Sequence, residues 1–229
     1  MHGLNPQQRA AIQYLDGPLL VLAGAGSGKT RVITQKIAHL VDNCGLQARN
    51  IAAITFTNKA AREMQERVGK LLPAAQAGEL QISTFHSLGV RILREEAKAL
   101  GYKPKFSIFD STDCYSIFAD LSASVDKATI RSIQWLVSGW KNAMKSPDQA
   151  AAEAKSEIEV LAAKAYRDYA ATLKAYQAVD FDDLILLPMQ LFQEHPKIRD
   201  KWQNRLRYLL VDEYQDTNAC QYQLLKLLT

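Results

Sequence analysis

The chain of 229 residues lacks several features that mark membrane and secreted proteins. No apolar run approaches the roughly 18 residues of a membrane span. The first residues, Met-His-Gly-Leu-Asn-Pro, hold no signal-peptide apolar core. The three cysteines, Cys44, Cys114 and Cys220, are isolated and odd in number, which argues against a disulfide framework or a zinc site. The sequence therefore predicts a cytoplasmic protein with no membrane partner.

The charge balance is only mildly basic, and neither repeats nor low-complexity tracts are present. Lysine and arginine number 28 against 24 acidic residues, a formal net charge of +4. This excess permits a polyanionic partner without requiring one. Hydrophobic residues make up 48% of the chain, which is ordinary for a globular protein with one large or two smaller domains.

A glycine-rich stretch near the N-terminus predicts a phosphate-binding loop. It follows the apolar run 18–22 and precedes a helical pattern over 31–41, the strand–loop–helix context that such a loop needs. Its glycines let backbone N–H groups turn toward phosphate oxygens, Lys29 can reach the outer phosphates, and the Thr30 hydroxyl can bind Mg²⁺. The general pattern starts with glycine where this chain has Ala23. The predicted nucleotide-binding residues here are Gly24, Ala25, Gly26, Ser27, Gly28, Lys29 and Thr30.

Two carboxylates near the other end complement this loop. Asp212 and Glu213 follow the short apolar run 207–211, which predicts a buried strand. Asp212 is placed to hold Mg²⁺, and Glu213 to accept a proton from an attacking water. A solvated pair of acids at a helix start is the alternative reading. Because ligands bind at the carboxyl ends of parallel strands, the two motifs together predict hydrolysis of a nucleoside triphosphate, ATP with Mg²⁺.

The order of strand and helix patterns predicts an α/β fold with a parallel, doubly wound sheet. Strands are expected at 18–22, 51–56, 80–84 and 207–211, with helices at 31–41 and 58–71. Between about 86 and 188 the strand signal disappears and helical patterns take over. We therefore expect an α/β domain formed by 1–85 and 189–229, interrupted by an all-helical insertion over 86–188.

Six segments resemble one family. They are Leu4–Gln8, Ala23–Thr30, Thr55–Ala61, Ser83–His86, Asp180–Leu184 and Val211–Asp216. In this order they resemble the N-terminal part of superfamily 1 DNA helicases of the UvrD/Rep type, where a loop that starts with alanine is usual. The resemblance implies a RecA-like P-loop domain called 1A, an inserted helical subdomain 1B, and ATP-driven 3′→5′ translocation on single-stranded DNA. Such proteins unwind duplex at single-strand/duplex junctions in replication or repair, and they need a second RecA-like domain, which this chain lacks.

The resemblance also suggests residue roles. Gln8 lies in the family's adenine-reading motif, and Arg31 is expected either beside the phosphates or as a solvated residue. His86 is weighed equally as a DNA contact and as a satisfied polar residue. The predicted DNA-binding residues are Phe56, Thr57, Asn58, Lys59, Thr84, Phe85 and His86.

Other conspicuous residues are given structural roles. Asp180, Asp182 and Asp183 are interpreted as a helix start rather than a metal cluster, and Trp135, Trp140 and Trp202 as core residues. Two other functions fit the same motifs. One is the motor part of a helicase–nuclease subunit, and the other is a nucleotide-gated single-strand-binding module without turnover.

Overall fold

The computed structural model describes residues 3–24, 26–122 and 126–229, and the chain divides into two compact units. The first unit combines the residues up to Phe85 with Asp200–Asp216 and Thr229. The second combines His86–Arg199 with Thr217–Leu228. Each unit is described by itself. Across the described ranges, no helix has the length and apolar character needed to cross a membrane.

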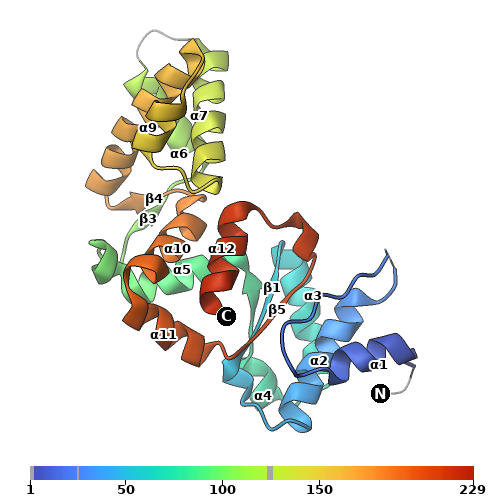
Figure 1. Cartoon of the computed structure of the whole chain (residues 1–229). Helices are drawn as coiled ribbons and strands as arrows, with labels where there is room; N and C mark the ends of the chain where they lie inside the picture. Colours follow the sequence, from blue (N-terminus) through green and yellow to red (C-terminus); the bar gives the residue numbers. More distant parts are fainter. Residues whose placement is uncertain (1–2, 25, 123–125) are drawn as a thin grey trace. The chain divides into compact units, whose positions relative to one another are not determined.

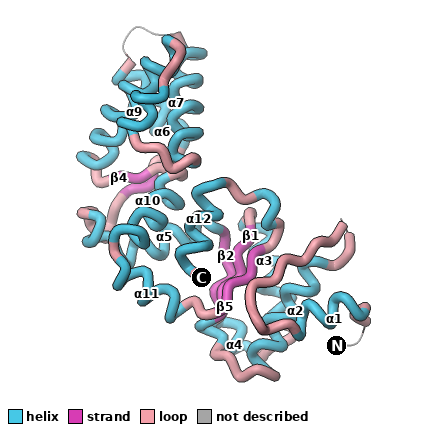
Figure 2. Tube along the Cα trace, in the orientation of Figure 1, coloured by secondary structure: helices cyan, strands magenta, loops and turns pink. Residues whose placement is uncertain are grey.

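A three-stranded parallel sheet forms the centre of the first unit (Figure 2). Its strands are β1 (Ile51–Thr55), β2 (Gln81–Thr84) and β5 (Tyr208–Val211), in the order β2-β1-β5. All five residues of β1 are buried, as expected for a central strand covered on both faces. The strands predicted over 51–56, 80–84 and 207–211 and their parallel arrangement are confirmed.

Helices pack against this sheet and bury its main core. The helices of the unit are α1 (Pro6–Gln13), α2 (Lys29–Asp42), α3 (Asn58–Gly69) and α4 (Ala74–Glu79), with a 3₁₀ turn η1 (Ala48–Asn50) and another, η3 (Tyr214–Asp216) (Figure 1). Ile37 and Leu40 of α2 and Met64 of α3 are fully buried against β1. Their helical spacing turns one apolar face of each helix to the core and confirms the helices predicted at 31–41 and 58–71.

The strand predicted over 18–22 is wrong. These residues form no regular secondary structure, and Leu20 and Leu22 are 63% and 86% exposed. The physical reason is pairing. The outer edges of β2 and β5 have no described strand beside them, but 18–22 pairs with neither, so its backbone has no ladder of hydrogen bonds. An apolar run can form a strand only where such a partner lies beside it.

The second unit is mainly helical. Its elements are α5 (Phe85–Glu96), which starts at the last residue of the first unit, η2 (Ala97–Leu100), β3 (Ser107–Ile108), α6 (Ser111–Leu121), α7 (Lys127–Asn142), α8 (Pro147–Glu153), α9 (Glu157–Ala175), β4 (Ala178–Val179), α10 (Asp183–Glu194) and α12 (Ala219–Leu228). Helix α11 (Pro196–Arg205) carries the chain from the second unit into the first. The insertion is not purely helical, because β3 and β4 pair in parallel over two residues each. Strands this short carry no periodicity that a sequence pattern can reveal.

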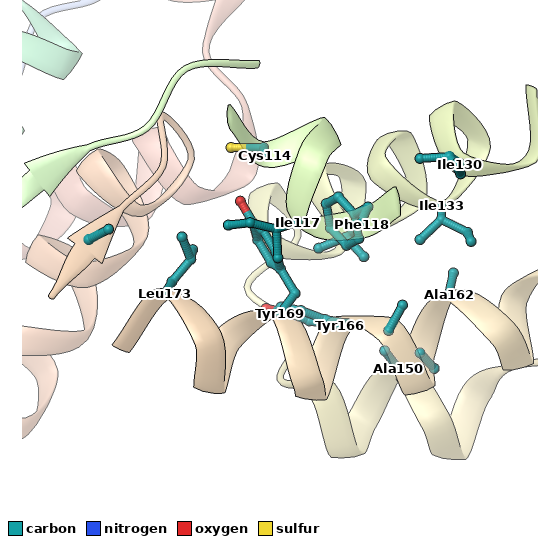
Figure 3. Packing of buried hydrophobic residues seen from close by; sticks show 14 residues of the cluster. Cys114, Ile117, Phe118, Ile130, Ile133, Ala150, Ala162, Tyr166, Tyr169 and Leu173 are labelled. Atoms are coloured by element: carbon teal, nitrogen blue, oxygen red, sulfur yellow. The ribbon is translucent and has the colours of Figure 1, made fainter. Parts of the chain in front are cut away.

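Aromatic and aliphatic side chains from α6, α7 and α9 fill the core of this unit (Figure 3). Phe118 stacks on Tyr169 with ring centroids 4.2 Å apart. Ile130, Ile133 and Val137 share one face of α7 and are buried there. These contacts hold the three helices together through ordinary hydrophobic packing.

Trp202 is fully buried, as predicted, but the core role predicted for Trp135 is wrong. Trp135 is 75% exposed. It lies on the other side of α7 from the buried Ile133 and Val137, because two residues along a helix turn a side chain by about 200°. Residue type alone suggested burial, whereas the helix face decides it.

Candidate functional site

The predicted phosphate loop lies between the exposed run 18–22 and α2. Gly26 and Gly28 adopt left-handed backbone conformations with φ of 72° and 85°, which favour glycine. The Ser27 hydroxyl donates to the Gly24 carbonyl at 2.6 Å, and the Lys29 ammonium lies 3.4 Å from the Ala23 carbonyl. Ala25 lies outside the described residues. The loop thus delivers Lys29 and Thr30 at the first turn of α2, whose N–H groups suit an anion.

Gln8 is fixed beside this loop by both ends of its amide. Asn5 and Gln8 form a capping box at the start of α1, in which the Asn5 N–H donates to Gln8 Oε1 at 3.0 Å. Gln8 Nε2 donates to the Ser27 carbonyl at 3.0 Å. A side chain at Gly28 would come within 3.1 Å of this amide nitrogen. The sequence Leu4–Gln8 therefore anchors α1 to the phosphate loop.

Arg31 also lies near this junction. It is exposed in the first turn of α2, and a Cβ built at Gly3 would lie 3.0 Å from Arg31 Nη2. The guanidinium therefore lies against the N-terminal segment.

Thr30 and Asp212 meet at the carboxyl end of β5. The Thr30 hydroxyl donates to Asp212 Oδ2 at 3.3 Å, and the Asp212 N–H donates to the Ile54 carbonyl of β1 at 2.9 Å. Asp212 is 7% exposed. A hydroxyl and one carboxylate are oxygen ligands of the kind that Mg²⁺ shares with water and phosphate. Among the described residues no cluster of three or more His, Cys, Asp or Glu side chains could hold a metal alone. The donor set therefore fits Mg²⁺ bound together with a nucleotide.

Glu213 adopts an unusual backbone conformation next to this pair. Its φ of 50° lies in the left-handed region, and its N–H donates to Asp212 Oδ1 at 3.0 Å. Gln215 Nε2 donates to the Glu213 carboxylate. Non-glycine residues in this region are uncommon and concentrate at functional sites. Asp212 is buried whereas Glu213 is partly exposed, so the two neighbouring acids lie in different environments.

The residues predicted to contact DNA after β1 and β2 divide into exposed and buried sets. The Phe56 and Phe85 rings lie 5.4 Å apart, at the same edge of the sheet as Asp212. Thr84 and Phe85 are only 6% and 2% exposed. Because both are buried, a ligand would reach only the exposed set, and Phe85 packs against the Phe56 ring. That set consists of the partly exposed Phe56 and the exposed Thr57, Asn58 and Lys59.

His86 begins the second unit, and its ring packs against that of Phe181. Its ring lies 5.7 Å from that of Phe181, which is 52% exposed. Burial lowers the pKa of His86, and the nearby charge of Asp182 opposes this effect. The ring is therefore suited to stacking and neutral hydrogen bonding more than to an ion pair. The exposed aromatic between acids, Asp-Phe-Asp-Asp, was the available signal for Phe181.

Asp180 and Asp183 have the structural role expected of them, with a partner that the sequence did not suggest. The Lys141 ammonium lies 2.7 Å from Asp180 Oδ2 and 2.8 Å from Asp183 Oδ1. The Tyr169 hydroxyl donates to the same Asp180 oxygen at 2.8 Å. Burial raises the pKa of Asp183 to about 6, although the charge of Lys141 opposes this. The group is a buried ion network that ties α7 and α9 to the start of α10.

Comparison with known proteins identifies the family of the chain. The model of the UvrD/REP helicase N-terminal domain matches residues 4–229. The ATP-dependent DNA helicases Rep of Salmonella typhimurium and Escherichia coli are each 55% identical over 228 residues, 98% of this chain and 34% of theirs. The ATP-dependent DNA helicase PcrA of Staphylococcus aureus is 44% identical over 232 residues, all of this chain and 32% of its own. The chain thus spans about a third of the length of these relatives. It belongs to the UvrD/REP helicase N-terminal domain family.

Proposed function

We propose that this chain is the nucleotide-binding motor part of a cytoplasmic, ATP-dependent 3′→5′ DNA helicase that acts in replication or repair. The observation that carries the proposal is the meeting of Thr30 and Asp212, which joins the phosphate loop to the carboxylate strand. The names of the relatives, ATP-dependent DNA helicases, support it. The first unit is then a RecA-like domain and the helical residues 86–188 are its inserted subdomain.

Each residue of the site has a distinct task in this proposal. Lys29 and the loop N–H groups hold the phosphates. Gln8 binds the adenine after its amide releases the Ser27 carbonyl, to which it now donates. Thr30 and Asp212 hold Mg²⁺, which neutralises charge on the phosphates. Glu213 takes the proton of the attacking water after its carboxylate leaves Gln215.

DNA contact is assigned to the surface next to this site. Phe56 presents an aromatic face to one base, and Asn58 and Lys59 lie where the sugar–phosphate backbone would pass. Because β1 and β5 are neighbours, these residues follow the strand beside Asp212. Movement of the Asp212 turn with the nucleotide state would then reach the DNA-binding residues directly. The partners are single-stranded DNA, single-strand/duplex junctions and a second RecA-like domain of the whole protein.

Oligonucleotide binding by the 229-residue chain tests this assignment. With a labelled single strand and fluorescence anisotropy, we expect weak binding that falls steeply as salt rises, since phosphate contacts release counterions. Phe56→Ala should weaken it by about 1–3 kcal/mol if a base stacks there. Tyr222→Ala, at an exposed aromatic of α12, is the matched control and should leave binding unchanged. If neither salt nor Phe56→Ala changed the binding affinity, the assignment of this surface to DNA would be refuted.

Phosphate release separates this function from a nucleotide-gated binding module. In the longer protein, single-stranded DNA should accelerate hydrolysis, whereas a gated module would bind ATP without turnover. The 229-residue chain should bind ATP but not separate strands, because a motor of this kind needs two RecA-like domains. Strand separation by the chain alone would contradict that requirement.

A further inference from the structure

One face of α7 carries an exposed stripe that the proposed function does not use. Lys127, Arg131 and Trp135 follow one another at intervals of four residues, so they share one side of the helix. All three are exposed, and Trp135 is 75% exposed. The stripe extends over about 12 Å at 1.5 Å per residue. A single exposed tryptophan is no sign of a ligand by itself, but here it lies one turn from an exposed arginine and beside a groove.

A groove opens beside this stripe and joins it to the aromatic pair described above. It has a volume of about 480 Å³ and is lined by Arg131, Trp135, Phe109 and Phe181, among others. Phe181 is the residue whose ring lies 5.7 Å from His86. Aromatic faces therefore continue from His86 through Phe181 to Trp135 within the second unit.

Three acidic residues also line the groove, and each of them has a hydrogen-bond or ion-pair partner within the protein. Asp180 is paired with Lys141. Asp110 caps α6, where it accepts the N–H groups of Thr112 and Asp113. Burial raises the pKa of Asp182, which accepts a hydrogen bond from Asn142 at 2.9 Å. Within the described residues, Arg131 has no acid within ion-pair distance, so the stripe presents positive charge outward.

We propose that the groove along α7 is an additional binding segment for single-stranded nucleic acid, with a base stacked on Trp135 and a phosphate on Arg131. The proposal rests on the proposed function, whose DNA surface it extends. Exposed aromatic rings spaced among cations are what a single strand needs, because each base offers a π face and each linkage one negative charge. A duplex would not fit this description, since its bases are already stacked on one another.

Tryptophan fluorescence offers a direct test on the 229-residue chain. Of the three tryptophans, Trp202 is fully buried and Trp140 packs against Tyr166, so a stacked base should quench mainly Trp135. Titration with an unlabelled oligothymidine of about 16 nucleotides should lower the emission, and Trp135→Phe should remove that change while anisotropy shows that binding persists. Trp140→Phe should keep the quenching.

Affinity measurements complete the test. Trp135→Ala should weaken oligonucleotide binding about 5- to 100-fold, and Trp135→Phe much less. Arg131→Gln should reduce the slope of log affinity against log salt by about 1, whereas Arg167→Gln, at an exposed arginine of α9 that pairs with Asp148, should not. ATP affinity should be the same in all of these variants, because the stripe lies outside the nucleotide site.

The outcomes separate this inference from the function on which it rests. If the unaltered chain binds no single strand, the DNA part of the proposed function fails. If Phe56→Ala weakens binding while Trp135→Ala binds like the unaltered chain, only the groove is refuted. Binding of blunt duplex DNA should depend on Trp135 much less than binding of a single strand does. If Trp135→Ala weakened both equally, the proposal would also be overturned.

Discussion

The hydroxyl of Thr30 donates a hydrogen bond to the carboxylate of Asp212 across 182 residues of sequence. Thr30 lies in the first turn of α2 and Asp212 directly follows β5, so the contact requires that both elements pack on β1 in the right register. It brings a phosphate-binding element and an acid to one place before any nucleotide arrives. Such preorganisation lowers the cost of ordering the site on binding.

Removal of the Lys29 ammonium should weaken ATP binding. Lys29→Ala deletes the charge-assisted hydrogen bonds to the outer phosphates, which are worth roughly 1.5–3 kcal/mol each. Isothermal calorimetry on the 229-residue chain measures the loss. Lys70→Ala removes an exposed lysine at the end of α3 and serves as the control. Equal ATP affinity in the unaltered chain and in Lys29→Ala would eliminate the phosphate-loop assignment.

Substitutions of the two neighbouring acids, Asp212 and Glu213, should impair ATP hydrolysis in different ways. In a protein that also carries a second RecA-like domain, Glu213→Gln should abolish turnover but keep ATP binding, because an amide has the same shape and cannot take the proton. Asp212→Asn should instead shift the Mg²⁺ concentration needed for binding upward. Steady-state phosphate release over a Mg²⁺ series distinguishes the two. Hydrolysis at a near-normal rate in Glu213→Gln would place the base elsewhere.

The buried ion network should be essential to the stability of the second unit. Lys141→Met leaves Asp180 and Asp183 buried without their cation, which should cost about 3–5 kcal/mol of unfolding free energy. Lys145→Met breaks an exposed pair with Glu153 and should cost at most about 1 kcal/mol. Urea denaturation followed by circular dichroism compares them. A loss as small for Lys141→Met as for Lys145→Met would show that the network contributes little.

Two helical glycines should respond oppositely to alanine. A Cβ at Gly89 of α5 would lie 1.7 Å from the Leu184 carbonyl oxygen, whereas one at Gly139 of α7 meets nothing within 4 Å. Gly139→Ala should therefore stabilise the chain by about 0.5–1 kcal/mol, and Gly89→Ala should destabilise it by about 1–3 kcal/mol or more. Thermal melting measures both. Stabilisation by Gly89→Ala would mean that α5 and α10 do not approach so closely.

His86 should be neutral at pH 7. Burial lowers its pKa, so the unfolded chain binds a proton more tightly than the folded one. Its contribution to stability is therefore complete above about pH 6.5 and is lost as the pH falls below that value. A titration of the imidazole by NMR should show a midpoint below 6.5. Asp182→Asn should lower this midpoint further, because the charge of Asp182 favours protonation. An upward shift in that variant would contradict the assignment.

The meeting of the two motifs was predictable from the sequence, although one of its premises was wrong. Both motifs were expected at one sheet edge because each follows an apolar run, and Thr30 and Asp212 do meet, but only the run 207–211 forms a strand. Lys141 was not predictable as a partner of Asp180, because 39 residues separate them and no local pattern reports a contact over that distance. The predictions of a core role for Trp135 and of a strand over 18–22 were wrong for a related reason. Composition and periodicity describe a segment alone, and burial depends on what lies beside it.

The exposed run 18–22 also affects how the 229-residue chain behaves at high concentration. Leu19, Leu20, Val21 and Leu22 are at least 42% exposed, and no described strand pairs with the outer edge of β5. Open strand edges and apolar patches are sites where separate molecules adhere to one another. Solubility, rather than folding, should therefore limit this chain in the laboratory. A single charged substitution at Leu22 should raise the concentration at which light scattering first appears.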